Sequence, residues 1–551
     1  MNIAEYVEVP GGTSLMDLAS MLAPRLGIDP VCAHVNNKTE GLRYCIYAPK
    51  QVEFLDAASP SGRRVYVRSM CMMLYRALVK VRPDLRLRIE HSISGGYLCH
   101  LFDSEGNMVT PDGEMLSGML AEMRRHVGER TPFLPHETLT GEVTEIYRRQ
   151  GLYSKISLLE TRGELYSAYY TFDGVADNYY GPLAPTAAEV PVFDLRPYHE
   201  GFLLLGPDPK RRDVPRQPVT QEKMYRAFED YLLFNRTIKV SDVGELNRSV
   251  MERRASELIN VAEAMHEKYL GDIAGRIAAR NGGRGARVVL LAGPSSSGKT
   301  TTTKRLAIQL MTRLKTPKMI SLDDYFVDRE HNPRDENGDY DYESLYALDL
   351  DRLNSDLRHL LDGEEINLPT YSFELGRRIE RHRPLRLDPD DVLLIEGIHG
   401  LNPELTRELP GEEVFKVYVS ALTSLSIDDH NWISTTDNRL LRRIVRDHKY
   451  RHTSALETIR RWPSVRRGEE KWIFPFQENA DATFNSSLIF ELGVMKAYAE
   501  PLLRQVPHVD PLYAEASRLL KFLSYFEPIP AEQVPFTSLL REFLGGSSFH
   551  Y

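Results

Sequence analysis

The stretch Arg287-Val-Val-Leu-Leu-Ala-Gly293-Pro-Ser-Ser-Ser-Gly298-Lys299-Thr300 decides the fold of the second half of the chain. Its first part is a continuous apolar run bounded by glycine, the pattern of a strand buried on both faces of a parallel sheet. The residues from Thr300 to Leu314 have helical periodicity. A strand, a glycine-rich turn and a helix in this order match GxxxxGK[ST], so the sequence predicts a phosphate-binding loop.

This loop is suited to a nucleotide because backbone N–H groups of the turn and of the helix N-terminus converge on an anion. Lys299 is expected to reach the β- and γ-phosphates, and the Thr300 hydroxyl to bind Mg²⁺. The alternative is a chance glycine turn beside a surface lysine. The expected ATP-binding residues are Gly293, Ser295, Ser296, Ser297, Gly298, Lys299, Thr300 and Thr301.

Two further apolar runs end in acidic residues. Pro317-Lys-Met-Ile-Ser-Leu leads to Asp323 and Asp324, and Asp390-Asp-Val-Leu-Leu-Ile leads to Glu396. Ligands of open α/β sheets bind at the carboxyl ends of the strands. We therefore expect Asp323 to accept the proton of an acceptor hydroxyl, and Glu396 to hold Mg²⁺ or the acceptor. Asp324 is expected to cap or orient, and two solvated loop aspartates are the alternative.

A basic helix follows further along the chain. The segment from Asp437 to Asp447 predicts a helix with Arg439, Arg443 and Arg446 on one face, at i, i+4 and i+7. Arginine binds oxyanions with two parallel hydrogen bonds and stays charged. We expect this face to close over phosphates, and a solvated helix surface is the alternative.

Composition describes an ordinary multidomain globular protein. The chain has 551 residues, 42% hydrophobic and 27% charged, with a formal net charge of −9, which argues against a protein that coats nucleic acid. Its four cysteines lack CxxC spacing and are interpreted as reduced core thiols: Cys32, Cys45, Cys71 and Cys99. We expect no membrane segment and a cytoplasmic location.

The pattern predicts a multidomain α/β and α+β protein. Residues 1–62 form a small mixed sheet covered by one helix, and residues 63–207 form a second α+β unit. A helical connector at 208–280 leads to a doubly wound parallel sheet with the phosphate loop at 281–505. A helical tail at 506–551 packs on this domain or on a partner helix, and homo-oligomerisation is left open.

These residues together resemble the uridine kinase and phosphoribulokinase family of P-loop kinases from about residue 288 to 503. The matching segments are Asp323-Asp-Tyr-Phe, Tyr340-Asp341-Tyr-Glu-Ser and Leu368-Pro-Thr-Tyr371-Ser-Phe373. The resemblance implies ATP and Mg²⁺ as cofactors and a small-molecule hydroxyl as acceptor. It implies Asp323 as general base together with Lys299 and Glu396 in catalysis. It also implies a substrate site made by Asp341, Tyr371, Phe373, Arg439, Arg443 and Arg446, although two aromatics after a proline are equally suited to a core.

One departure affects the acceptor. Uridine kinases carry a pyrimidine-recognising histidine where this chain has Gly376. A nucleoside of the uridine or cytidine type is the expected acceptor, with a sugar or polyol as the alternative.

The first half of the chain has its own resemblance. Residues 1–62 resemble a TGS domain, a ubiquitin-like module, and residues 63–207 resemble the second additional domain of threonyl-tRNA synthetases. The four metal-ligand positions of that domain fall at Arg68, Met72, Tyr179 and Leu183, which are not zinc ligands, so editing chemistry is expected to be absent. A nucleotide-gated, RNA- or ribosome-associated regulator is the alternative function, although RNA binding is not favoured.

Overall fold

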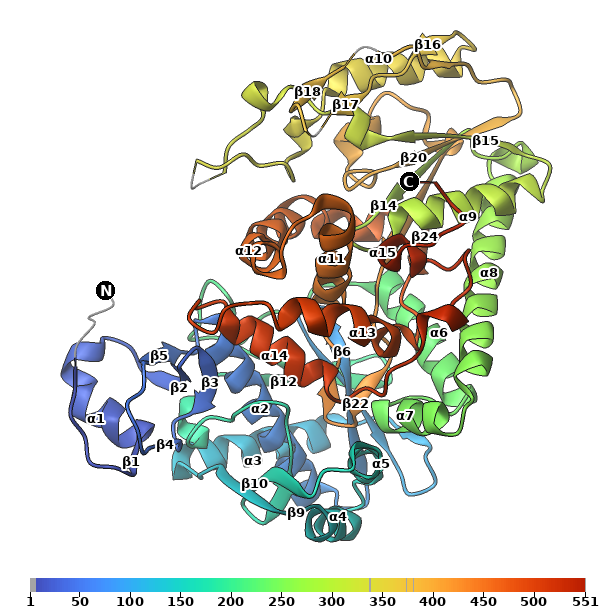
Figure 1. The fold of residues 1–551 in the computed structure, drawn as a ribbon. Helices are drawn as coiled ribbons and strands as arrows, with labels where there is room; N and C mark the ends of the chain where they lie inside the picture. Colours follow the sequence, from blue (N-terminus) through green and yellow to red (C-terminus); the bar gives the residue numbers. More distant parts are fainter. Residues whose placement is uncertain (1–5, 336–337, 373, 380, 551) are drawn as a thin grey trace.

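The computed structural model describes residues 6–335, 338–372, 374–379 and 381–550. The first half of the chain forms the lower part of the molecule in Figure 1, and the parallel sheet with its covering helices forms the upper part. Helices from the last third of the chain lie between these two parts. Among the described residues, no helix combines the length and apolar character required to cross a membrane.

The N-terminal unit is a small antiparallel sheet with one helix. Strands β2, β3 and β5 pair in the order β3-β2-β5, and the short strands β1 and β4 pair beside them. Ser14 caps the helix by accepting a hydrogen bond from the Asp17 amide, and Gly27 ends it in the left-handed conformation. The elements are β1 (Thr13–Ser14), α1 (Leu15–Leu26), β2 (Pro30–Val35), β3 (Lys38–Gly41), β4 (Cys45–Ile46) and β5 (Val52–Asp56).

The second unit packs two antiparallel sheets around the long buried helix α2. One sheet has the order β12-β13-β7-β6, with β8 paired to β7, and the other has the order β11-β10-β9. Cys71 and Cys99 lie in this core, and all four cysteines are free thiols. The elements are α2 (Pro60–Val81), β6 (Arg86–Ile93), β7 (Gly96–Phe102), β8 (Met108–Val109), α3 (Gly113–Glu129), β9 (Leu134–Leu139), α4 (Thr140–Arg149), α5 (Tyr153–Arg162), β10 (Tyr166–Phe172), β11 (Val175–Asp177), β12 (Asp194–Tyr198) and β13 (Gly201–Leu205).

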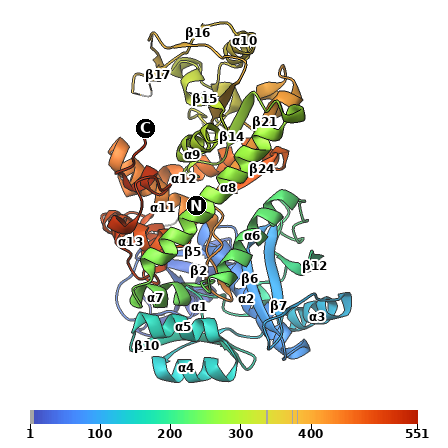
Figure 2. The ribbon, with the colours of Figure 1, turned by 90° about the vertical axis from the view of Figure 1, so that its right-hand side faces the viewer.

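Three helices follow the second unit: α6 (Glu222–Thr237), α7 (Val243–Met251) and α8 (Ala255–Ala279). Figure 2 shows α8 running obliquely from α7, beside the first half of the chain, up to the parallel sheet. There it packs along α9 (Lys299–Met311), and Arg305 of α9 bonds Glu267 of α8 at 2.8 Å. These helices therefore tie the helix after the phosphate loop to the first half of the chain.

The parallel sheet has the order β15-β20-β14-β21-β24, and all its pairs are parallel. Val289 and Leu291 of β14 face the core that includes α8 and α9, whereas Val288 and Leu290 face the core that includes α10. Burial on both faces explains the uninterrupted apolar run. The strands are β14 (Val288–Ala292), β15 (Thr316–Ser321), β20 (Asp391–Glu396), β21 (Val414–Ser420) and β24 (Ala482–Asn485).

The remaining elements surround this sheet. A group of short hairpins lies beside α10 at the top of Figure 1. Helices α11 and α12 pack against one another, and α13, α14 and α15 complete the chain. The elements are α10 (Leu350–Leu361), β16 (Ile366–Asn367), β17 (Tyr371–Ser372), β18 (Arg377–Arg378), β19 (Pro384–Leu385), β22 (Ser426–Asp428), β23 (Asn431–Trp432), α11 (Thr435–Arg451), α12 (Ala455–Trp472), α13 (Glu491–Leu503), α14 (Tyr513–Leu523) and α15 (Arg541–Leu544).

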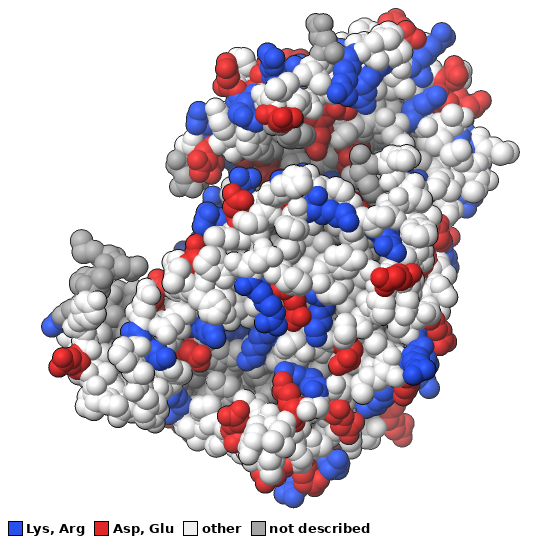
Figure 3. All heavy atoms as spheres, in the orientation of Figure 1, with Lys and Arg blue, Asp and Glu red and all other residues white. Residues whose placement is uncertain are grey.

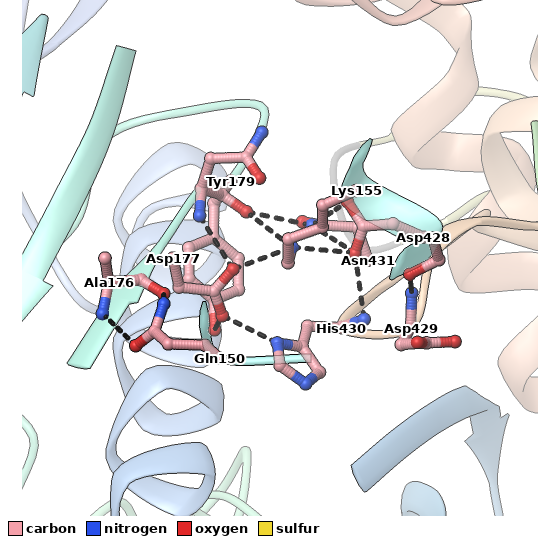
Figure 4. A network of polar contacts seen from close by, with 11 residues as sticks. Gln150, Lys155, Ala176, Asp177, Tyr179, Asp428, Asp429, His430 and Asn431 are labelled. Carbon is pink, nitrogen blue, oxygen red and sulfur yellow. Dashed lines mark hydrogen bonds and ion pairs between the residues drawn. The ribbon is translucent and has the colours of Figure 1, made fainter. Parts of the chain in front are cut away.

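The β22–β23 hairpin, which directly precedes α11, is buried against the second unit. Figure 4 shows Lys155 of α5 pointing between Asp177 at the end of β11 and Asp428 of the hairpin. Its Nζ lies 2.7 Å from Asp177 Oδ1 and 2.9 Å from Asp428 Oδ1. His430 Nδ1 lies 2.7 Å from the second oxygen of Asp177, and Tyr179 donates its hydroxyl to the same oxygen. The two halves of the chain are therefore joined by buried charges.

These contacts set the charge of Asp177. Burial by itself raises the pKa of a carboxyl group, but Lys155 and His430 outweigh it and hold the pKa of Asp177 below its usual value. Lys155 therefore forms a buried ion pair with Asp177, and breaking such a pair by removing one partner costs about 3–5 kcal/mol.

Candidate active site

The phosphate loop has the conformation that its glycines predict. Gly293 lies so close to β21 that a Cβ atom would sit 2.0 Å from the Val419 carbonyl oxygen. Gly298 has φ +83° and caps α9. Glycine tolerates both conditions because it has no side chain. Lys299, the first residue of α9, donates its Nζ to the Pro294 carbonyl at 3.2 Å.

This loop opens into a cleft of about 1220 Å³, which is named the central cleft here. Figure 3 shows the molecule hollowed between the upper hairpins and the body below, with acidic and basic side chains on the walls. The lining includes residues from the phosphate loop, the strand ends, the hairpin region, α11, α12 and the C-terminal tail: Ser295, Lys299, Thr300, Asp323, Asp341, Glu343, Tyr371, Glu396, Arg443, Arg446, Arg461 and Glu542.

Glu396 lies beside the loop because of the strand register. It ends β20, opposite Leu291 of β14 and Ser321 of β15. Its Oε1 atom accepts hydrogen bonds from Thr300 Oγ1 and Ser321 Oγ, each at 3.3 Å. Burial and the nearby Asp323 raise the pKa of Glu396 to about 7, against the opposing effect of Lys299. The oxygens of a carboxylate and two hydroxyls meet here, a donor set that Mg²⁺ accepts.

Asp323 lies in a turn of 3₁₀-helix directly after β15 and is exposed to the interior of the cleft. Its partial removal from bulk water raises its pKa, while Lys299 and Arg451 oppose that rise. Asp324 points elsewhere and pairs with Arg383 at 3.0 Å. Of the two acids after β15, Asp323 is therefore the one that faces the cleft.

Two of the residues expected to bind the acceptor line the central cleft. Asp341 and Tyr371 both line it, and the Tyr371 ring lies 5.6 Å from that of Phe326. Phe373 lies outside the described residues. At Gly376, with φ +67°, a Cβ atom would meet the Arg329 guanidinium at 2.6 Å, and Arg329 also lines the cleft. A larger side chain at position 376 would displace Arg329.

The structure separates the three arginines that helix periodicity groups together. Arg443 and Arg446 line the central cleft, and Arg443 donates to Ser295 Oγ at 2.8 Å. Arg439 is 1% exposed and is absent from the lining of the cleft. It pairs with the buried Glu469 of α12 and donates to the Ser295 carbonyl at 2.9 Å. The contacts of Arg439 therefore orient the phosphate loop from behind.

A model of the Phosphoribulokinase / Uridine kinase family matches residues 288–488. A uridine kinase of Brevibacillus brevis is 32% identical over 192 residues, which are 35% of this chain and 80% of the relative. The chain belongs to the Phosphoribulokinase / Uridine kinase family. A uridine kinase of Staphylococcus epidermidis is 29% identical over 195 residues, 35% of this chain and 84% of the relative. The match to a solved structure of a possible uridine kinase from Bacillus stearothermophilus covers 40% of this chain and 98% of the chain of that structure, with 21% sequence identity and a TM-score of 0.28.

As a member of the Phosphoribulokinase / Uridine kinase family, the protein is an ATP-dependent phosphotransferase with a hydroxyl group as acceptor. The comparisons confirm the kinase resemblance of the second half of the sequence. The matched residues include the whole parallel sheet, the phosphate loop and α12.

Three residues at the phosphate loop or the central cleft are not predicted to be functional from the sequence, although one of them, Glu343, lies in the Tyr340-Asp341-Tyr-Glu-Ser segment. Arg442 is fully buried, pairs with Glu491 and donates to the Ser296 carbonyl at 3.4 Å. Glu343 lines the cleft, where burial and the neighbouring Glu469 raise its pKa to about 7. The helical spacing of Arg466 and Glu469, which pair at 3.0 Å, is the one local pattern that points to Glu469.

Proposed function

We propose that this family kinase transfers the γ-phosphate of ATP to a hydroxyl of a small molecule of the nucleoside type. The observation that carries the proposal is the central cleft, because the phosphate loop, Asp323 and Glu396 share it with Asp341 and Tyr371. A kinase requires a nucleotide, a base and an acceptor within one water-limited space. The sequence similarity to relatives named uridine kinase supports a nucleoside as the acceptor.

The loop residues Gly293, Ser295, Ser296, Ser297, Gly298, Lys299, Thr300 and Thr301 would hold the nucleotide phosphates. The Thr300 hydroxyl and Glu396 would hold Mg²⁺, and the 3.3 Å contact between them is consistent with two ligands of one ion. Bound Mg²⁺ neutralises charge on the phosphates and orients them. Lys299 would add its charge to the same phosphates because it starts α9, at the positive end of the helix dipole.

Asp323 would accept the proton of the acceptor hydroxyl. A general base works best when its pKa lies near the working pH, and the raised pKa of Asp323 moves it in that direction. Arg443 and Arg446 would stabilise negative charge that spreads over the transferred group. Asp447 accepts bonds from both, at 3.2 and 2.9 Å, and so limits their motion.

Acceptor recognition would involve Asp341, through hydroxyl groups, and Tyr371, through contact with a base or ring. Because Arg329 lies against Gly376, the pyrimidine-reading position of uridine kinases is changed here. A sugar or polyol acceptor is therefore the second outcome that an acceptor screen must include.

A screen of nucleosides, sugars and polyols for uptake of labelled γ-phosphate tests this proposal. Lys299→Ala is expected to abolish transfer, and Asp323→Asn to lower turnover by about 10²–10⁴-fold with ATP affinity retained. Asp324→Asn is the matched control and should keep turnover. Undiminished turnover in Lys299→Ala, or ATP consumption that depends on added RNA and yields no phosphorylated small molecule, would contradict the proposal.

For the first half of the chain we propose that TGS-like and editing-like modules serve as a scaffold. Arg68, one of the four former metal-ligand positions, is buried and donates to the Pro182 carbonyl at 3.2 Å. Met72, Tyr179 and Leu183 are buried in the core of the second unit. These internal contacts support a structural role for the four positions, and added tRNA is expected to leave kinase turnover unchanged.

A further inference from the structure

The C-terminal tail reaches the phosphate loop. Leu539 lies against Gly298, where a Cβ atom would be only 2.6 Å from the leucine side chain. Lys449 of α11 donates to the Leu544 carbonyl at 2.8 Å, so the tail is also fixed to the helix that carries the cleft arginines. The absence of a side chain at residue 298 lets Leu539 of the tail pack directly against the phosphate loop.

At this contact Glu542 binds the first turn of α9. Its Oε2 atom accepts a hydrogen bond from the Thr301 amide at 3.1 Å and another from the Thr301 hydroxyl at 2.6 Å. Residues 301 and 542 are brought together although 241 positions separate them. Glu542 also lines the central cleft. A carboxylate of the chain's own tail thus occupies donors at the N-terminal end of the helix after the phosphate loop.

These donors are of the kind that a phosphate group uses. The first amides of a helix have no partner within the helix, and the helix dipole favours an anion there. A carboxylate and a phosphate of bound ATP are both negative and would require the same N–H and O–H groups. Their repulsion in a partly enclosed cleft is strong, so the two anions exclude one another.

On the basis of the proposed nucleotide site, we propose that Glu542 competes with a phosphate of ATP for the amide and hydroxyl of Thr301. The tail would in this way restrain nucleotide binding. The backbone of the tail is anchored independently. The fully buried Phe543 packs against the guanidinium of Arg442 of α11 at 5.0 Å, and Lys449 of the same helix holds the Leu544 carbonyl, while Arg541 bonds the Val534 carbonyl within the tail at 2.6 Å. ATP therefore displaces the Glu542 side chain by rotation, while Phe543 and the bond from Lys449 to the Leu544 carbonyl keep the tail in place.

Affinity measured by calorimetry on the full chain tests this competition. Glu542→Gln keeps one oxygen acceptor for the Thr301 amide, removes the charge and replaces the second oxygen with an NH2 group. We expect it to bind ATP and inorganic tripolyphosphate about tenfold more tightly than the unchanged chain, since a charge-assisted hydrogen bond becomes a neutral one. Adenosine, which carries no phosphate, should bind both chains equally.

Two further variants serve as controls. Glu532→Gln changes an exposed carboxylate of the same tail and should leave every affinity unchanged. Glu542→Ala, checked by thermal unfolding, removes the acceptor as well and should also bind tripolyphosphate more tightly. Unchanged or weaker tripolyphosphate binding by folded Glu542→Gln would overturn the competition, because Glu542 would then be a cap that coexists with nucleotide.

The outcome is separable from that of the proposed function. Tighter ATP binding by Glu542→Gln without any phosphorylated acceptor would support the competition and overturn the proposed acceptor chemistry. Phosphorylation of a small-molecule acceptor, together with an ATP affinity that Glu542→Gln leaves unchanged, would support the acceptor chemistry and overturn the competition. If neither chain binds ATP or tripolyphosphate, both proposals are overturned.

Discussion

Glu469→Gln is expected to destabilise the protein and loosen the phosphate loop. Glu469 accepts the Ser295 amide at 3.1 Å and pairs with Arg439, which in turn bonds the Ser295 carbonyl. Both charged side chains are nearly inaccessible, at 1% exposure for Arg439 and 0% for Glu469. The amide variant leaves a buried guanidinium without its counter-charge, for which a loss of about 3–5 kcal/mol in unfolding free energy is expected.

Arg439→Met should lower the free energy of unfolding by less, because Glu469 keeps its ion pair with Arg466 at 3.0 Å. We expect about 1.5–3 kcal/mol, the scale of losing hydrogen bonds made by a charged group. In the double variant neither charge is left behind. Its loss should therefore fall short of the sum of the two single losses by about 1–3 kcal/mol.

Urea unfolding measures these losses of unfolding free energy, and the fluorescence of Trp462 reports on the surroundings of Arg439. The Trp462 ring lies 5.4 Å from the Arg439 guanidinium carbon. Glu470→Gln is the matched control, because Glu470 is 64% exposed and its removal should change stability by about 0.5 kcal/mol or less. Additive losses in the double variant, or a Glu469→Gln chain as stable as Glu470→Gln, would refute the argument that this pair is one buried unit.

Two further predictions concern the joints between the halves of the chain. Lys155→Ala leaves Asp177 and Asp428 buried without their cation and should lower the free energy of unfolding by about 3–5 kcal/mol. As a control, Lys80→Ala changes an exposed lysine and should alter this free energy by about 0.5 kcal/mol or less. Thermal unfolding checks the prediction, and equal unfolding midpoints for the two variants would contradict it. Burial would raise the pKa of Glu515, but Arg518 and Arg64 outweigh it and lower the pKa to about 2. Relative to an unfolded value of about 4.3, this contributes about 3 kcal/mol at pH 7, which is lost as pH falls from about 4 to about 2. Glu515→Gln should be less stable than the unchanged chain at pH 7 and equal to it near pH 2, and a constant difference at every pH would refute the assignment.

The parts of the site that sequence predicts well are those with a local pattern. Apolar runs bounded by glycine or acid specify β14 and β20, and the Lys299 motif specifies the loop between strand and helix. Parallel strands then place Glu396 and Asp323 beside that loop, as strand-end geometry requires.

Helical periodicity is less informative where one face of a helix is partly buried against another helix and partly open to a cleft. The spacing of Arg439, Arg443 and Arg446 places them on one face, but α12 covers the first turn of that face. Arg439 is consequently enclosed with Trp462 and Glu469, while Arg443 and Arg446 reach the cleft. Whether an arginine meets solvent or an opposing carboxylate depends on packing between helices, and single-sequence patterns do not encode this.

Contacts over long sequence separations are also outside the reach of pattern. Glu542 follows no motif, and its neighbours in the sequence predict a short amphipathic helix. It meets Thr301 only because α11 and α13 bring the tail back across the loop. The Lys155 pair has the same origin, since its partners come from β11 and from the β22–β23 hairpin.

The burial of that hairpin has a consequence for how the chain can be divided. The family match begins at residue 288 and ends at residue 488, and so contains the hairpin but not Lys155 or Asp177. A fragment cut at these limits would leave Asp428 without its cation and would expose Trp432, which packs 4.6 Å from the Tyr97 ring. The limits of shared ancestry and the limits of a self-sufficient folding unit are therefore different in this protein. A fragment intended to be soluble and active should retain the partners of the hairpin from the second unit.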